Sequence, residues 1–218
     1  MSTEFAIASV EVGKLNALVK NVMRQMRSDD PNEAIRRVNS GEWMVVLVPE
    51  QAQHCWHEQD EVIYFSVTSD GTTGSQWIER LESKSFRIGD YAKSVLLSPD
   101  FKPTCEVTTE IAILKGMLFT DNDRVTKKIR AEADKRKLTK PNAEIACLIR
   151  EKFSDEEIEA MDLWWIVAMH EPIKDSVGDP DLLSTSRYDD GRWLHAYYGK
   201  PDYRWGRNNG FAFAVSQV

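Results

Sequence analysis

An α+β fold is predicted for this chain of 218 residues, and three observations predict it. Apolar residues recur at helical spacing in several segments, which is typical of amphipathic helices. Two apolar runs, residues 163–169 and 211–215, have the length and composition of buried strands. The segment between these runs is rich in Gly, Asp, Ser and Tyr, which is typical of loops and short β-hairpins.

The first hundred residues predict both helices and strands. Helical spacing of Val and Met, and Pro31 directly after Asp30, predict two helices in the first 40 residues. Thr73 and Gln76 form a capping box, which predicts a helix that begins there. The other expected elements are strands at residues 43–48 and 62–68 and a short helix over residues 91–96.

Residues 98–104, SPDFKPT, contain two prolines, and proline interrupts both helices and sheet ladders. We therefore expect a domain boundary here. It separates a small mixed α/β N-terminal domain, residues 1–101, from a second domain, residues 102–218.

The second domain is expected to combine strands with three helices. The β-branched run within residues 106–114 favours a strand, with a helix as the alternative. The run at 163–169 is the most apolar in the chain, so we expect it at the centre of the sheet. The expected helices are a charged one over 122–137, an amphipathic one over 141–153 and a short one that begins at the capping box of Ser154 and Glu157.

The net charge of −7 does not favour a general attraction to nucleic acid or to an anionic membrane. The three cysteines are far apart and odd in number, which favours a reducing compartment over a disulfide framework. No apolar run approaches the roughly 20 residues of a membrane helix, and the N-terminus lacks the pattern of a signal peptide. We therefore expect a soluble, cytoplasmic protein without a membrane span.

Catalytic and metal-binding motifs are sparse. His170 and Glu171 are adjacent, and adjacent strand residues point to opposite faces, which favours a structural role over a metal pair. His54 and His57 have no second cluster at ligand spacing. The sequence has no Gly-rich phosphate loop and no recognisable nucleophile motif. We therefore expect no enzymatic activity, no metal and no cofactor.

Residues 124–137 carry seven Lys or Arg against two acidic residues. Aromatic residues are not interleaved with these charges, which favours a solvated helix face over contact with phosphates. A nucleic-acid-binding regulator that uses the helix at 124–140 is nevertheless the alternative function.

Residues 184–209 contain four of the six tyrosines and two tryptophans, separated by Ser, Asp, Asn and Gly. Tyr and Trp supply large contact areas at low entropic cost, while Ser, Gly and Asn supply adaptable hydrogen bonds. This composition is typical of a binding face. An aromatic hairpin that packs on its own domain is the alternative.

Three segments carry a family resemblance: LWWIVAMHEPIKDSVGDPDLL from residue 163, DGRWL from residue 190 and GFAFAVSQV from residue 210. With them, residues 102–218 resemble the variable proteins of diversity-generating retroelements. The resemblance implies a C-type-lectin-like fold in this domain. It also implies that an error-prone reverse transcriptase rewrites adenines of a template, so that Asn codons of the AAC type become many others.

Codons that end in C cannot encode Lys, Glu, Gln, Met or Trp. Within residues 184–209 only Lys200, Trp193 and Trp205 depart from this set, so we expect all three to be framework residues and the two tryptophans to be buried. The candidate varied, ligand-binding positions are Ser184, Ser186, Tyr188, Asp190, His195, Ala196, Tyr197, Tyr198, Gly199, Tyr203, Gly206, Asn208 and Asn209. Of these, we expect the side chains of Tyr188, His195, Tyr197, Tyr198, Tyr203 and Asn208 on one exposed face.

The resemblance thus implies a non-enzymatic protein whose diversified C-terminal face binds varied ligands. A face rich in Tyr suits a protein ligand better than a small molecule. Glu171-Pro172 is followed by Ile173, where calcium-dependent lectins that resemble this fold carry an amide, so calcium-mediated sugar binding is not expected.

Overall fold

The computed structural model describes residues 55–188 and 191–216, together with isolated positions between 30 and 42. The chain divides into two compact units, Met1–Pro49 and Glu50–Val218. In the first unit, positions 32, 33, 36 and 37 are helical, and the rest of the two expected helices and the expected strand at 43–48 lie outside the described residues. The second unit has the α+β composition that the sequence predicts.

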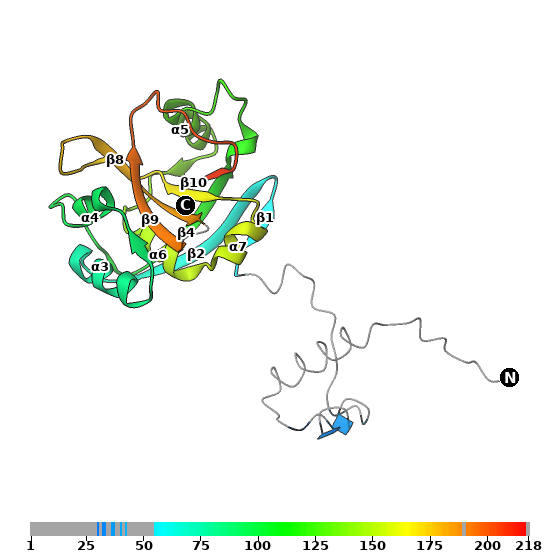
Figure 1. Ribbon diagram of the computed structural model, residues 1–218. Coiled ribbons are helices and arrows are strands. Elements are labelled where there is room, and N and C mark those ends of the chain that lie inside the picture. Colours follow the sequence, from blue (N-terminus) through cyan, green and yellow to red (C-terminus); the bar gives the residue numbers. More distant parts are fainter. Residues whose placement is uncertain are drawn as a thin grey trace. The chain divides into compact units, whose positions relative to one another are not determined.

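Ten strands of the described chain form one sheet (Figure 1). The main path runs in the order β1-β2-β4-β10-β6-β8-β9-β3, while β5 pairs with β10 and β7 with β8. The strands are β1 (His57–Gln59), β2 (Val62–Asp70), β3 (Arg87–Ile88), β4 (Cys105–Lys115), β5 (Leu138–Thr139), β6 (Trp165–Ala168), β7 (Ile173–Lys174), β8 (Pro180–Tyr188), β9 (Gly191–Tyr198) and β10 (Asn209–Val215).

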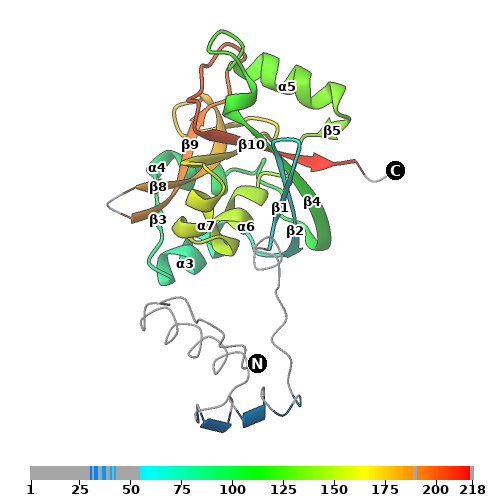
Figure 2. The ribbon, with the colours of Figure 1, turned by 90° about the vertical axis from the view of Figure 1, so that its right-hand side faces the viewer.

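Within the described residues from 55 onward, five α-helices and one 3-10 helix cover the two faces of this sheet. Residues of α3, α4, α6 and α7 pack into one apolar cluster, and residues of α5 pack into a second cluster on the opposite face. Figure 2 shows α6 and α7 on one side of the sheet and α5 on the other. The helices are α3 (Gly74–Ser83), α4 (Asp90–Leu96), η2 (Gly116–Leu118), α5 (Thr126–Lys135), α6 (Ile145–Lys152) and α7 (Asp155–Ala160).

Alternation along β10 explains why the sheet has two apolar faces. Phe211 and Phe213 belong to the cluster below α5, whereas Ala212 belongs to the cluster below α6. Successive strand residues point to opposite faces, so a run such as FAFAV can fill both sides of a central strand. β10 pairs with β4 on one side and with β6 on the other, which places it in the interior of the sheet.

Most sequence-predicted elements of this unit are confirmed. Residues 105–115 form a strand, not the alternative helix. Both capping boxes are present, at the start of α3 and at the start of α7. β6 lies between β10 and β8, as expected for the most apolar run.

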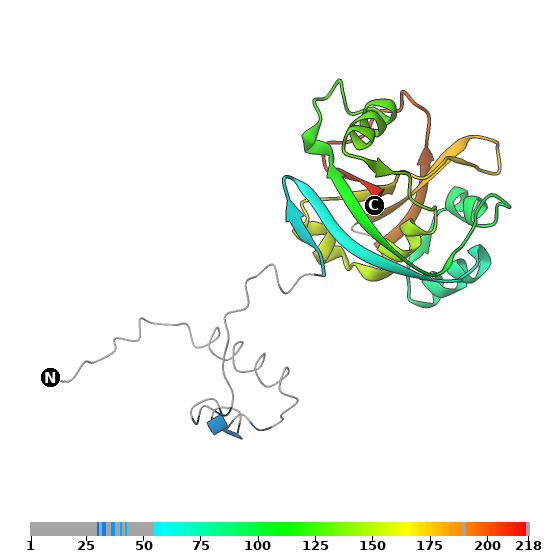
Figure 3. The same cartoon turned by 180° about the vertical axis from the view of Figure 1, so that it is seen from behind.

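The expected boundary after residue 101 is wrong. β2 and β4, which lie on either side of it, pair antiparallel from Val62–Leu114 to Asp70–Cys105 (Figure 3). Phe101 is itself buried in the larger apolar cluster. The two prolines therefore mark a connection within one sheet, and the compact unit begins near residue 50.

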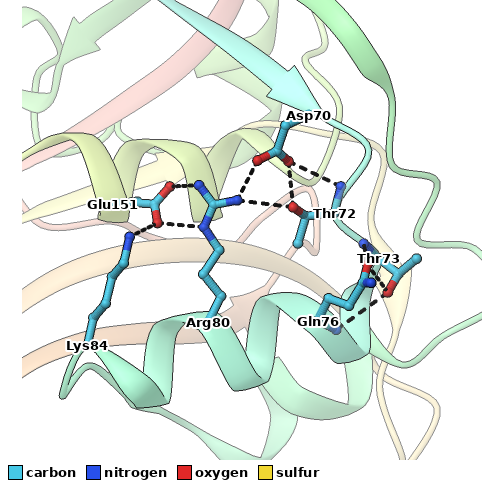
Figure 4. Close-up of polar contacts among 7 residues, drawn as sticks. All are labelled: Asp70, Thr72, Thr73, Gln76, Arg80, Lys84 and Glu151. Carbon is cyan, nitrogen blue, oxygen red and sulfur yellow. Dashed lines mark hydrogen bonds and ion pairs between the residues drawn. The ribbon is translucent and has the colours of Figure 1, made fainter.

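A polar network on the side of the sheet that α3 and α6 cover ties α3 to both β2 and α6 (Figure 4). The guanidinium of Arg80 forms ion pairs with Asp70 and with Glu151, and Lys84 also pairs with Glu151. The pKa of Asp70 is lowered to about 2, most strongly by a hydrogen bond from Thr72 and next by one from Arg80. These contacts again cross the expected boundary, so residues 55–101 belong structurally with the rest of the sheet.

Candidate ligand-binding face

Five ring-bearing side chains lie together on one face of β6, β8 and β9. Their register explains the grouping, because Trp193 and His195 on β9 pair with Ser186 and Ser184 on β8, and Trp165 on β6 also pairs with Ser186. Residues paired across neighbouring strands point to the same face. We call this surface the aromatic face, and it consists of Trp165, Tyr188, Trp193, His195 and Tyr197.

The rings of the aromatic face contact one another in an unbroken series. Trp165 stacks on Tyr197 with ring centroids 4.6 Å apart, and Trp193 stacks on His195 at 4.8 Å. Tyr188 meets both stacks edge-on, at 5.8 Å from His195 and 6.0 Å from Trp165. All five side chains are half-buried, so each presents part of its ring to solvent while its neighbours hold the rest.

Polar and charged groups border these rings. The Tyr188 and Tyr197 hydroxyls lie 3.3 Å apart, and burial, followed by this hydrogen bond, raises the pKa of Tyr197. At the β3 edge, the guanidinium of Arg87 lies 5.4 Å from the centre of the Trp193 ring, within cation–π range. The face therefore offers apolar area together with hydroxyl, imidazole and guanidinium groups.

Trp205 anchors the loop that follows β9. It is 5% exposed, its Nε1–H donates to the Thr126 hydroxyl at 3.0 Å, and its ring contacts Phe211 in the core. The Trp205 ring also meets Tyr203 at 4.7 Å and Tyr197 at 6.5 Å, which connects the loop to the aromatic face. Trp205 is buried, as expected.

Trp193 does not fit the same expectation. It is half-buried, with its ring between His195 and Arg87 rather than in the core. The reason is its place on β9, where it points to the face that bears the aromatic series, while its neighbour Leu194 points into the apolar core. Trp193 is part of the candidate binding surface.

None of the six side chains expected on one exposed face is buried, but four of the other candidate varied positions are. Tyr198, Gly206 and Asn208 are exposed, and Tyr188, His195, Tyr197 and Tyr203 are half-buried. Ala196 packs against the cluster on the opposite side of the sheet. Asp190 lies outside the described residues. The four buried positions are Ser184, Ser186, Gly199 and Asn209.

The buried positions have identifiable physical causes. β8 is flanked by β6 and β9, so Ser184 and Ser186 form the floor beneath the rings, and their hydroxyls have no hydrogen-bond partner among the described residues. At Gly199, an added Cβ would lie 2.8 Å from Cγ of Pro172. A polar or small residue predicts exposure in a loop, but not on an interior strand.

Substitution of the floor should therefore be costly, whereas substitution of an exposed position should not. Ser186→Tyr should lower the free energy of unfolding by about 1–3 kcal/mol or more, because the larger side chain must displace packed rings. Asn208→Tyr should change it by less than about 0.5 kcal/mol. Urea denaturation of the two variants measures this difference. Equal stability of both variants would show that the floor is not packed as described.

His170 is a structural residue in this fold, as the sequence favours. It is buried, its Nδ1–H donates to the Glu171 carbonyl at 2.6 Å, and its Nε2 accepts the Leu183 N–H at 2.9 Å. Burial lowers the pKa of His170 to about 4. Glu171 instead points to solvent and pairs with Lys140. The described part of the chain holds no group of three or more metal-ligating side chains arranged to bind an ion.

The basic segment is largely committed to local contacts. Lys127 pairs with Asp202 at 2.6 Å, and Lys128 pairs with Asp123 at 2.5 Å. Arg124 is buried, and its guanidinium donates hydrogen bonds to the backbone carbonyls of Gly116 in η2 and of Phe119, the residue after η2. His57 stacks on Tyr64, and His54 lies outside the described residues.

Comparisons of the chain with family models, with curated proteins and with solved structures found no match. Among the helices that the structure describes, none combines the length and the apolar character needed to cross a membrane.

Proposed function

We propose that this is a non-enzymatic binding protein that recognises protein ligands through its aromatic face. We propose further that a diversity-generating retroelement varies the exposed residues of this face, and that the domain has a C-type-lectin-like fold. The observation that carries the proposal is the unbroken series of half-buried rings across three strands. Rings held by their neighbours offer contact area that loses little conformational entropy on binding.

The positions that suit diversification are the exposed or half-buried ones, such as Tyr188, His195, Tyr198 and Asn208. Ser184 and Ser186 fit the proposal less well, since they form the floor. The free state of all three cysteines is consistent with the cytoplasmic location that we propose.

The alternative, a nucleic-acid-binding regulator, receives less support. Its helix carries Lys127 and Lys128, and both ammonium groups are already paired with carboxylates. Phosphate contact would have to replace these ion pairs, and its affinity would fall steeply with salt.

A matched pair of substitutions tests the proposed function. Tyr188 lies on the aromatic face, while Trp164, 49% exposed, lies on the opposite face against Arg187. Proteins captured from the source organism by the wild-type chain should be purified and titrated calorimetrically against both variants. Tyr188→Ala should weaken binding by about tenfold or more, as expected for an aromatic hot spot, whereas Trp164→Ala should leave it unchanged.

A salt series on the same complex separates the two candidate functions. Between about 50 and 200 mM salt, the affinity for a protein ligand should change little, whereas phosphate-driven binding should fall by orders of magnitude. Retained affinity in Tyr188→Ala, or a steep salt dependence that disappears in Lys127→Gln, would contradict the proposal.

A further inference from the structure

A pocket of about 300 Å³ opens at the end of β9, next to the aromatic face, with which it shares Tyr197. Its lining comes from parts of the chain that are distant in sequence: α4, the connection between β7 and β8, the start of β8, the end of β9 and the loop after β9. The lining side chains that matter here are Tyr91, Asp175, Asp181, Tyr197, Tyr198 and Tyr203.

Asp181 is the chemically unusual member of this lining. The residue is 3% exposed, no hydrogen bond or ion pair from the described residues reaches its carboxylate, and the carboxylate oxygens stay accessible from the pocket. Desolvation, followed by the charges of Asp175 and Asp179, raises the pKa of Asp181 to about 6. An ionised carboxylate buried without a partner is costly, and the cost is relieved when a cation binds beside it.

The two neighbouring carboxylates are satisfied, unlike that of Asp181. The Asp175 side chain accepts hydrogen bonds from the backbone N–H groups of Val177 and Asp179, each at 2.9 Å. Asp179 pairs with Lys200 at 2.9 Å. Asp181 is therefore the carboxylate of this group that is left to hold a ligand.

The tyrosine rings suit the same kind of ligand. Tyr91 and Tyr198 are 52% and 44% exposed, so their rings are accessible at the mouth of the pocket. The ammonium of Lys200 already lies 4.6 Å from the centre of the Tyr198 ring, which places a cation within binding range of that ring. Aromatic rings around a carboxylate favour an organic cation, since the rings attract its charge and contact its alkyl part.

We propose that this pocket binds an alkylammonium group such as a lysine side chain, with the Asp181 carboxylate as its counter-ion and the tyrosine rings as its walls. A metal ion is a poorer fit, because the described residues provide no group of three ligating side chains for one. This assignment rests on the proposed function, in which the ammonium group belongs to the protein ligand. Asp181 and Tyr91 precede the varied segment, so they would be constant, whereas the walls formed by Tyr197, Tyr198 and Tyr203 would vary.

The probe for this site is Nα-acetyl-lysine methylamide, whose only charge is the side-chain ammonium. Titration of the wild-type chain, followed by amide chemical shifts around Asp181 and Tyr198, should give a dissociation constant of about 1 mM, as expected for a ligand of this size. The Nε-acetylated analogue, which has no charge, should not bind. Equal binding of the two compounds, or no shift at ten times that concentration, would overturn the inference.

Asp181→Asn is the matched variant, because it keeps the shape and removes the charge. It should weaken the probe at least about tenfold, the loss typical of removing one partner of a desolvated charge pair. The variant should unfold at the same or a higher temperature, since it removes a largely desolvated charge that has no partner. Unchanged affinity in a folded Asp181→Asn variant would contradict the proposed role of this carboxylate.

Acidification provides an independent readout. The charged groups that face Asp181 are Asp175, Asp179 and Lys200, and the other titratable groups of the lining are tyrosines. Binding needs ionised Asp181, so affinity should fall about tenfold from pH 7 to pH 5. Affinity that does not change over this range would contradict the inference. The two proposals can fail independently. If the probe does not bind but a protein ligand still requires Tyr188, the proposed function stands and the pocket inference fails. If the probe binds but no protein ligand requires Tyr188, the pocket inference stands and the proposed function fails.

Discussion

Trp205→Ala should lower the free energy of unfolding by about 3–5 kcal/mol, the loss expected for a large buried aromatic side chain. The ring contacts Phe211 and Tyr203, and its N–H donates a hydrogen bond to the Thr126 hydroxyl at the start of α5. Truncation therefore creates a cavity and also releases the loop after β9 from α5. Urea denaturation at neutral pH measures the loss.

Trp193→Ala is the matched control, since it removes the same side chain from a half-buried site on the aromatic face. Its cost should be about 1 kcal/mol, near the centre of the range for single substitutions. Similar losses for both variants would contradict the assignment of Trp205 to the framework and of Trp193 to the binding surface.

Acid should remove about 3 kcal/mol of stability through His170 alone between pH 7 and pH 4. The pKa of His170 falls from 6.5 to about 4 on folding, because the buried ring is held neutral. The unfolded chain therefore takes up a proton as the pH falls below about 6.5, while the folded chain does not until about pH 4. The stability is fully present above the unfolded pKa and is lost across this window.

Asp181 has the opposite effect over part of the same window. Its folded pKa of about 6 lies above its ordinary value of 3.8, so its protonation favours the folded state. The His170 contribution is therefore measured as the difference between the wild type and His170→Leu. The variant is less stable at pH 7, since it leaves the Leu183 N–H without an acceptor, but the difference should move by about 3 kcal/mol in its favour by pH 4. A difference that is constant with pH would contradict a neutral, buried His170.

The sequence could predict the parts of this fold that depend on local patterns. The runs at 163–169 and 211–215 are strands because only interior strands tolerate such continuous apolar composition. Thr73 and Ser154 begin helices because their hydroxyls and the following Gln or Glu satisfy free N–H groups. These signals are contained within a few residues and are largely independent of the rest of the chain.

The features that failed, or were missed, depend on contacts between distant segments. The prolines near residue 100 locate a connection, but only the pairing of β2 with β4 shows that both sides belong to one sheet. Ser184 and Ser186 lie in a stretch whose composition is typical of loops. They are buried because β8 has a neighbouring strand on either side. Asp181 is an ordinary acidic residue in sequence, and its isolation emerges only when α4, β8 and β9 enclose it.

Sequencing of the gene and its flanking locus in many cells of the source strain tests the proposed diversified binding face most directly. A reverse transcriptase gene and a near-copy of the 3′ end should lie beside the gene. Substitutions should concentrate in codons for exposed and half-buried ring positions such as Tyr188, His195 and Tyr198, and should spare Trp205. A locus without a near-copy, together with substitutions spread evenly over exposed and buried codons, would contradict this account.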